Sequence, residues 1–114
     1  MPCVFFETPL FSRLLPDYLS DEGYRELQRT LLENPELGDV MPGTGGFRKV
    51  RWEDARRRKG KRGGLRVIDY SLTADHQIWF FTLYGKDEAA DLTAEEKNLL
   101  KKAIQAELTA RRKS

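Results

Sequence analysis

Cysteine and histidine are nearly missing from this sequence, which has one of each among 114 residues. Because Cys3 has no second cysteine to pair with, the chain forms no internal disulfide, as expected for a protein of the reducing cytoplasm. Cys3 also has no histidine partner in view for nucleophilic catalysis. His76 falls in a predicted turn, away from the densest positive charge, where we expect a surface residue rather than a proton carrier.

Metal-binding and nucleotide-binding motifs are missing as well. Asp87, Glu88 and Asp91 form an acidic cluster. Neither a liganding histidine nor a regular loop spacing accompanies them, so we interpret them as solvated charge and turn residues. The run PGTGGF at 42–47 matches neither glycine-rich phosphate-binding pattern. We therefore expect no metal site and no cofactor.

Long apolar runs are the third missing feature. None approaches the ~20 residues that span a membrane, and the start, MPCVFFETPLF, lacks the basic region and cleavage site of a signal peptide. We expect no membrane segment. The length favours a single domain over residues 1–114, large enough to bury a core without disulfides.

Positive charge is present but unevenly spread. Residues 1–46 carry three basic and eight acidic side chains, residues 47–66 carry ten and two, and residues 67–114 carry seven and eight. A net charge of +8 thus lies between flanks of −5 and −1, although the whole chain has only +2. This distribution indicates a local polyanion-binding surface rather than a generally basic protein.

Three helices are predicted from their end signals. Thr8 caps the first helix, which should break near Pro16, while Ser20 and Asn34 bound the second. The third opens with a capping box of the form T-x-x-E at 93–96. The side chains expected to be buried on the second and third helices are Tyr24, Leu27, Leu31, Leu32, Leu99, Leu100, Ala103, Ile104 and Leu108.

Four strands are predicted, over 3–7, 47–52, 65–72 and 77–85, with a hairpin turn at 73–76. The last strand is apolar on both sides, which predicts a place inside the sheet. Alternation puts Trp79, Phe81 and Leu83 on one face and Ile78, Phe80 and Tyr84 on the other. The fold class is therefore α+β: a small, mainly antiparallel β-sheet with two N-terminal helices and one C-terminal helix packed on it.

Residues 48–66, which we call the basic segment, span a predicted strand, a loop and the start of the next strand. A solvated loop is one interpretation, because charge runs are usually exposed. Three features favour single-stranded RNA binding instead. Cations continue into the strands, glycines let the backbone approach a ligand, and Phe47, Trp52 and Tyr84 are aromatic residues that can stack on bases.

An enzyme built on this segment would have to work with lysine, arginine and tyrosine. Cleavage of RNA by its own 2′-OH suits these residues, since it needs neither a metal nor a protein nucleophile. Clustered cations stabilise the charge of the pentacovalent phosphate. They also lower the pKa of a neighbouring lysine, which lets that lysine act as a base.

Three runs, LGDVMPGTGGFRKVRW, GKRGGLRVIDY and FFTLYGKDEAADLTAEEK, carry a family resemblance. Together with the start VFFETPLF, they make the chain similar over nearly its whole length to the HigB/RelE-type toxins of bacterial type II toxin–antitoxin modules. The resemblance implies a RelE-like fold and a ribosome-dependent endoribonuclease that cuts messenger RNA in the decoding site. It also implies a cognate helix-turn-helix antitoxin that blocks the toxin.

The resemblance also implies roles for individual residues. Arg66 would stabilise the scissile phosphate. Tyr84 and Lys86, which share a strand face by their spacing of two, would serve proton transfer and base stacking. The residues that would bind RNA phosphates are Arg48, Lys49, Arg51, Lys61 and Arg62.

Some of these assignments have competing interpretations. Arg48 and Arg51 fall on opposite faces of a regular strand, so without a bulge they cannot both reach one phosphate, and we rank Arg51 below the others. Arg66 could instead cover apolar surface with its stem, and Tyr84 could be a core residue. Two other functions use the same surface: a non-catalytic nucleic-acid-binding module, and a protein-interaction domain that meets an acidic partner.

Overall fold

A five-stranded sheet organises the part of the chain that the computed structural model describes, which is residues 3–53, 64–86, 88 and 92–113. The elements are β1 (Val4–Glu7), α1 (Pro9–Tyr18), α2 (Asp21–Glu33), β2 (Asp39–Val40), β3 (Arg48–Trp52), β4 (Leu65–Leu72), the short 3₁₀ helix η2 (Thr73–Asp75), β5 (Gln77–Gly85) and α3 (Ala94–Lys113). The strand order is β1-β5-β4-β3-β2, with β1 parallel to β5 and the other pairs antiparallel. The predicted α+β fold is confirmed, and the two-residue strand β2 is an addition to it.

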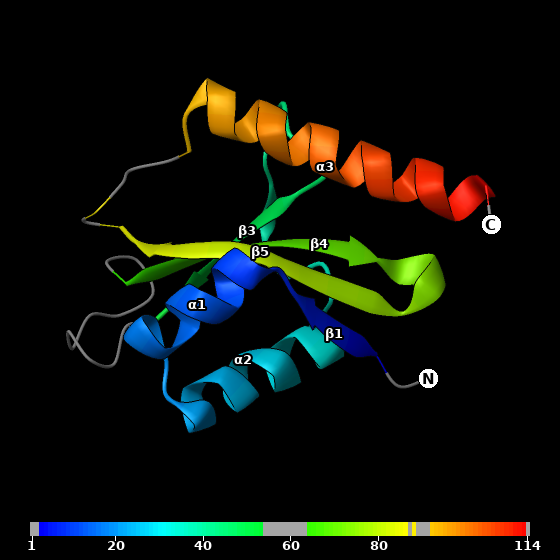
Figure 1. Cartoon of the computed structure of the whole chain (residues 1–114). Coiled ribbons are helices and arrows are strands. Elements are labelled where there is room, and N and C mark those ends of the chain that lie inside the picture. Colours follow the sequence, from blue (N-terminus) through cyan, green and yellow to red (C-terminus); the bar gives the residue numbers. More distant parts are fainter. Residues whose placement is uncertain (1–2, 54–63, 87, 89–91, 114) are drawn as a thin grey trace.

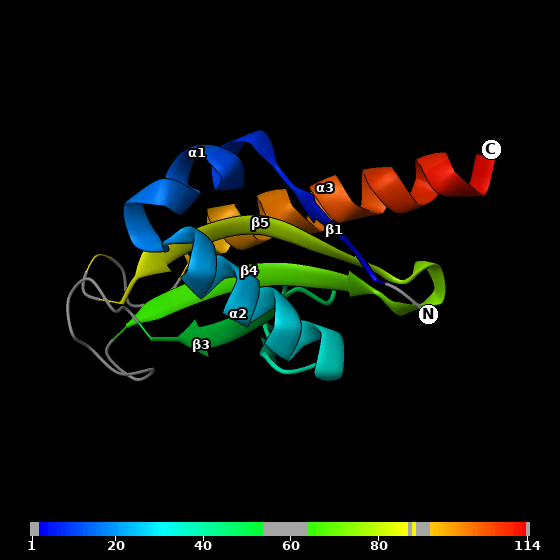
Figure 2. The same cartoon turned by 90° about the horizontal axis from the view of Figure 1, so that it is seen from below.

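Helices cover both faces of the sheet. Figure 1 shows α1 and α2 on one face and α3 on the other, and Figure 2 shows the α1 and α2 side from below. The cluster that we call the α1/α2 core contains Phe11, Leu19, Leu27, Leu31, Val50, Trp52, Leu65, Val67, Ile78, Phe80 and Leu83. The α3 core contains Met41, Phe47, Ile68 and Ile104, with further side chains packed on it. Strand β5 thus has a neighbour on each side and a core on each face, as its apolar sequence predicts.

A β-bulge interrupts the pairing of β4 with β5. Ile68 pairs with Thr82 and Asp69 pairs with Phe80, so Phe81 is an extra residue on β5. An extra residue breaks the strict alternation of side chains between the two faces.

The bulge changes which β5 side chains share a face. Alternation predicts Leu83 with Phe81 and Tyr84 with Phe80. In the structure Leu83 joins Phe80 in the α1/α2 core, whereas Tyr84 joins Phe81 against the α3 core. The prediction was wrong because it assumed an uninterrupted strand. The consequence is that Tyr84 lies on the α3 face of the sheet.

The predicted helix starts are confirmed by their hydrogen bonds. The hydroxyl oxygens of Thr8 and Ser20 accept from backbone N–H groups three residues later, at 3.1 and 3.0 Å. At the start of α3, the Thr93 hydroxyl accepts from the N–H of Glu96 (3.1 Å), and the Glu96 carboxylate accepts from the N–H of Thr93 (2.8 Å). These bonds satisfy N–H groups that have no partner inside a helix.

Helix α1 ends at Tyr18, near Pro16 as predicted, and a proline in its last turn removes only one backbone bond. The burial of some helix side chains differs from prediction. Leu32 and Leu99, expected to be buried, are 47% and 59% exposed, and Ala103 is also exposed. Helices α2 and α3 thus bury a narrower stripe of side chains than their apolar residues suggest.

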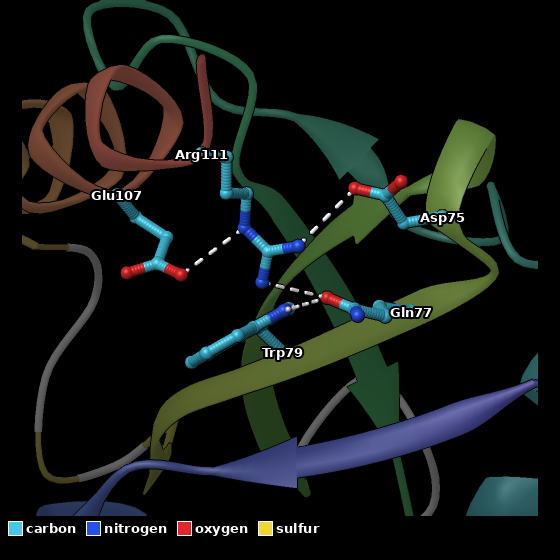
Figure 3. A network of polar contacts seen from close by, with 5 residues as sticks. All are labelled: Asp75, Gln77, Trp79, Glu107 and Arg111. Atoms are coloured by element: carbon cyan, nitrogen blue, oxygen red, sulfur yellow. Dashed lines mark hydrogen bonds and ion pairs between the residues drawn. The ribbon is translucent and has the colours of Figure 1, made fainter. Parts of the chain in front are cut away.

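Arg111 fastens the C-terminal part of α3 to the sheet (Figure 3). Its guanidinium donates to Glu107 (3.1 Å), to Asp75 beside the β4–β5 hairpin (3.2 Å) and to the side-chain oxygen of Gln77 (2.8 Å). It also lies 5.6 Å from the centroid of the Trp79 ring, a cation–π contact. We call these five residues the Arg111 network.

Candidate functional site

A row of three side chains crosses three neighbouring strands. Arg51 of β3 pairs with Arg66 of β4, and Arg66 pairs with Tyr84 of β5. Directly opposed residues lie on the same face of a sheet, so these three form what we call the Arg–Arg–Tyr row. The row is on the α3 face, because Tyr84 packs against the α3 core. It crosses the end of the sheet where β3 and β5 stop and β4 begins (Figure 1).

Arg66 is the buried member of the row, with 4% of its surface exposed. Its Nη1 donates a hydrogen bond to the carbonyl oxygen of Leu65 (3.1 Å). Burial lowers the pKa of Arg66, the charge of Arg51 lowers it further, and Tyr84 has the opposite effect. A guanidinium nevertheless stays charged in proteins. The row therefore holds a fixed positive charge in a poorly solvated place, where it acts strongly on a neighbouring anion.

The two arginines of the row are like charges directly opposite one another, an arrangement that destabilises paired strands. Arg51 is exposed, and no ion pair joins it to an acidic residue in the described part of the chain. An anion between the guanidiniums would relieve the repulsion and receive hydrogen bonds from planar, forked donors. The pair is therefore chemically suited to a phosphate group.

Two lysines flank the row. The backbone N–H of Lys86 donates to the carbonyl oxygen of Gly64 (2.9 Å), which continues the β4–β5 ladder beyond the last residue of β5. Lys86 directly follows β5 and is exposed. That its side chain shares the face of Tyr84, as strand alternation suggests, stays a prediction. Lys49, two residues before Arg51, shares that face and is half-buried.

Arg48 and Arg51 lie on opposite faces of β3, as predicted for a strand without a bulge. Arg48 is on the α1/α2 side, where its guanidinium donates to the carbonyl oxygens of Glu36 (3.2 Å) and Gly38 (2.8 Å). It also lies 3.6 Å from the Glu36 carboxylate. These contacts tie β3 to the segment before β2. Arg51, which we ranked below the other phosphate-binding candidates, is thus the arginine of β3 that lies beside Arg66.

Two of the three aromatic residues expected to stack on bases are enclosed in the cores. Phe47 is fully buried in the α3 core, and Trp52 is 7% exposed in the α1/α2 core on the opposite face. Tyr84 is half-buried and is the aromatic member of the row. Lys61 and Arg62, expected to bind phosphates, lie outside the described residues.

A contact at the end of β5 was not predicted from the sequence. The carboxylate of Glu88 accepts hydrogen bonds from the hydroxyl of Tyr18 (2.7 and 2.8 Å to its two oxygens) and from the N–H of Gly85 (2.9 Å). The N–H of Glu88 donates to the Gly85 carbonyl oxygen (3.0 Å). Gly85 is buried, and leaving such an N–H without a partner costs about 1–3 kcal/mol. Glu88 is an exposed turn residue, as interpreted from the sequence, but its hydrogen bonds to Tyr18 and Gly85 were not predicted. Asp87 and Asp91 lie outside the described residues.

A buried carboxylate, Asp69, lies on the face of the sheet opposite the row. It pairs with Arg48 in β3 and Phe80 in β5 and is 0% exposed. Within the described part of the chain, neither of its carboxylate oxygens has a hydrogen-bond partner. Burial raises the pKa of Asp69 to about 7, although the charge of Arg48 opposes the rise. This residue is separated from the row by the sheet.

Searches for metal sites and membrane-spanning helices in the described part of the chain, and for matching protein families, all gave negative results. Among the described residues, no group of three or more histidine, cysteine, aspartate or glutamate side chains is placed to hold a metal ion. No helix formed by those residues is both long enough and apolar enough to cross a membrane. Comparison of the chain with models of protein families finds no match.

Proposed function

We propose that this protein is a ribosome-dependent endoribonuclease that cuts translated messenger RNA and is neutralised by a cognate helix-turn-helix antitoxin. The resemblance to HigB/RelE-type toxins suggests this function. The observation that supports it most is the Arg–Arg–Tyr row with Lys86 beside it. Two guanidiniums and a phenol thus share one face at one end of the sheet, and Lys86 directly follows β5 at that end. These groups can bind a phosphate and move protons without an imidazole.

The reaction that suits these groups is attack of a 2′-oxygen on the adjacent phosphorus. The 2′-OH gives its proton to a base while the new bond from its oxygen to phosphorus forms. The bond from phosphorus to the 5′-oxygen breaks, and that oxygen takes up a proton. The products are a 2′,3′-cyclic phosphate and a 5′-hydroxyl, and no water or redox partner is consumed.

Each member of the site has a part in this scheme. Arg51, which is exposed, contacts the phosphate oxygens directly, and Arg66 adds a fixed charge beside it. Both favour the transition state, in which the phosphate carries extra negative charge. Lys86 and Tyr84 transfer protons, and the ring of Tyr84 offers a surface for a base.

A non-catalytic RNA-binding module is the second candidate function. The small exposed fraction of Arg66, 4%, favours it, because a buried arginine contacts fewer phosphate oxygens than an exposed one. The packing of Tyr84 against the α3 core points the same way. Both functions use the same face of the sheet, so only a test of RNA cleavage separates them.

Expression of the chain alone separates the two functions. A nuclease should arrest bacterial growth and leave codon-associated cuts in translated messages. The Lys86→Ala variant is the best control, because Lys86 is exposed and its truncation leaves both cores intact; we expect normal growth and intact messages. Uncut messages at good soluble expression of the wild-type chain would contradict the nuclease and support the binding module.

A further inference from the structure

At the end of β5, the backbone N–H of Gly85 is bonded by a side chain from outside the sheet, that of Glu88. In an antiparallel ladder, successive N–H groups point to opposite sides of the strand. The N–H of Lys86 points toward β4, where it donates to Gly64, so the N–H of Gly85 points toward the other side. On that side β1 pairs with β5 only from Gln77 to Phe80. The carboxylate of Glu88 therefore takes the place of a strand at Gly85.

Glu88 bonds the backbone of Gly85, the residue directly before Lys86. Glycine has the widest choice of backbone conformations, so Gly85 would be a pivot between Tyr84 and Lys86 if nothing held it. Bonds in both directions between Gly85 and Glu88 close a turn around Lys86. This turn determines where the Lys86 ammonium group can reach.

Glu88 is itself held by a rigid element. The hydroxyl of Tyr18, in the last turn of α1, donates its one hydrogen to the Glu88 carboxylate, whose two oxygens lie 2.7 and 2.8 Å from the hydroxyl oxygen. Helix α1 packs on β5 through the α1/α2 core. The carboxylate is thus fixed relative to the sheet from one side and holds Gly85 on the other.

We propose that Glu88 is a positioning residue that fixes the turn after β5, so that the Lys86 ammonium group faces the Arg–Arg–Tyr row. This inference rests on the proposed function, because it concerns the same RNA-cleaving site. We assign Glu88 positioning rather than proton transfer, because its carboxylate bonds two groups of the fold, the Tyr18 hydroxyl and the Gly85 N–H.

Positioning and direct catalysis predict different results for the amide variant. In Glu88→Gln, the side-chain oxygen can still accept from both Tyr18 and Gly85, so the turn should persist without the charge. In Glu88→Ala both contacts are lost. A catalytic carboxylate would fail equally in the two variants, whereas a positioning residue fails only in the second.

The test is cleavage of a messenger RNA held on purified ribosomes, with kcat and KM measured separately. We expect Glu88→Ala to lower kcat about 10- to 100-fold, the size of effect that a misplaced group produces. Its KM should stay within about twofold of wild type, because Arg51 and Arg66 still bind the phosphate. Glu88→Gln should keep kcat within about threefold of wild type.

Two further variants complete the experiment. Tyr18→Phe should lower kcat partially, and adding it to Glu88→Ala should cause no further loss, because residues that act as a unit are non-additive. Glu95→Ala, which removes an exposed carboxylate from the first turn of α3, is the matched control and should leave kcat unchanged. Hydrogen exchange of the Gly85 amide should quicken in Glu88→Ala and not in Glu88→Gln.

The outcomes distinguish this inference from the proposed function. A wild-type kcat in Glu88→Ala, equal losses in the alanine and glutamine variants, or unchanged Gly85 exchange in Glu88→Ala would each overturn the positioning role while the wild-type protein still cuts RNA. A wild-type protein that cuts no RNA on the ribosome would instead overturn the proposed function, and the positioning role with it.

Discussion

Neighbouring arginines on one strand have different surroundings, and those surroundings decide what each can do. Arg48 bonds the backbone before β2 and faces Asp69 across the strands, whereas Arg51 is exposed and faces Arg66. The first is built into the fold by its contacts with carbonyl oxygens. The second lies where a phosphate oxygen can reach it.

Alanine substitutions of these two arginines should therefore separate activity from stability. We expect Arg51→Ala to lower the rate of RNA cleavage about 100-fold, because a cation that stabilises the transition state is lost. The midpoint of thermal unfolding should be unchanged or slightly raised, since a like-charge pair is removed. Cleavage of ribosome-bound messages and calorimetry on the same preparations measure the two effects.

The matched variant is Arg48→Ala, which removes the hydrogen bonds to Glu36 and Gly38. We expect a loss of about 1–3 kcal/mol in the free energy of unfolding with a nearly wild-type cleavage rate for the folded protein. The reverse pattern, with activity lost in Arg48→Ala and kept in Arg51→Ala, would contradict this account, because it would mean that the active site lies on the α1/α2 face of the sheet and not on the α3 face.

Asp69 should make stability depend on pH. Its pKa is about 7 in the folded chain and 3.8 ordinarily, so the folded state favours the protonated form. The contribution of this shift to the free energy of unfolding is complete below about pH 4 and is lost as the pH rises to about 7. At roughly 1.4 kcal/mol per pKa unit, the loss is about 4 kcal/mol. In Asp69→Asn the charge cannot form, so unfolding free energies measured from pH 4 to 8 should not show this loss.

The control for this experiment is Asp17→Asn, which changes an exposed carboxylate on α1. Its pH profile should run parallel to that of the wild type. Parallel profiles for wild type and Asp69→Asn would mean that Asp69 is not buried as a neutral acid.

Helices and strands show which parts of this molecule the sequence predicts. The helix starts at Thr8, Ser20 and Thr93 follow from local bonds, which a short run of residues specifies completely. The bulge at Phe81 could not be predicted, because β5 is apolar on both faces and no polar residue marks the change of side. The same bulge brings Tyr84 to the face of Arg66, so this part of the site depends on it.

Helix α3 is held at its C-terminal end by contacts that no sequence pattern indicates. The Arg111 network joins residues more than 30 positions apart, which only the tertiary fold brings together (Figure 3). We expect Arg111→Ala to lower the free energy of unfolding by about 1–2 kcal/mol, since its partly exposed ion pairs are screened by solvent. Hydrogen exchange in the last turns of α3 should quicken, and mass spectrometry can measure it.

Two variants of α3 test the specificity of this effect. Arg111→Lys should not restore stability, because lysine lacks the forked donors and the planar group that lies over Trp79. Lys102→Ala, at an exposed position of the same helix, should change stability by no more than about 0.5 kcal/mol. An equal loss in Lys102→Ala would mean that the helix responds to any change of charge.

The whole molecule has helices on both faces of the sheet and the Arg–Arg–Tyr row at one end (Figures 1 and 2). The segment with the excess charge of +8, residues 47–66, contains Arg51 and Arg66 of this row. Composition could not indicate which cations share a face, because that depends on strand register. It also could not identify Glu88, whose partners Tyr18 and Gly85 are distant from each other in sequence.

Cleavage of a messenger RNA with one 2′-deoxynucleotide at the cut position tests the proposed chemistry most directly. The natural message on the ribosome should be cut to a 2′,3′-cyclic phosphate and a 5′-hydroxyl. The deoxy message should bind equally well and stay intact, because the attacking oxygen is gone. Cutting of the deoxy message, or 5′-phosphate ends on the natural one, would contradict catalysis by cations acting on the 2′-OH of the RNA.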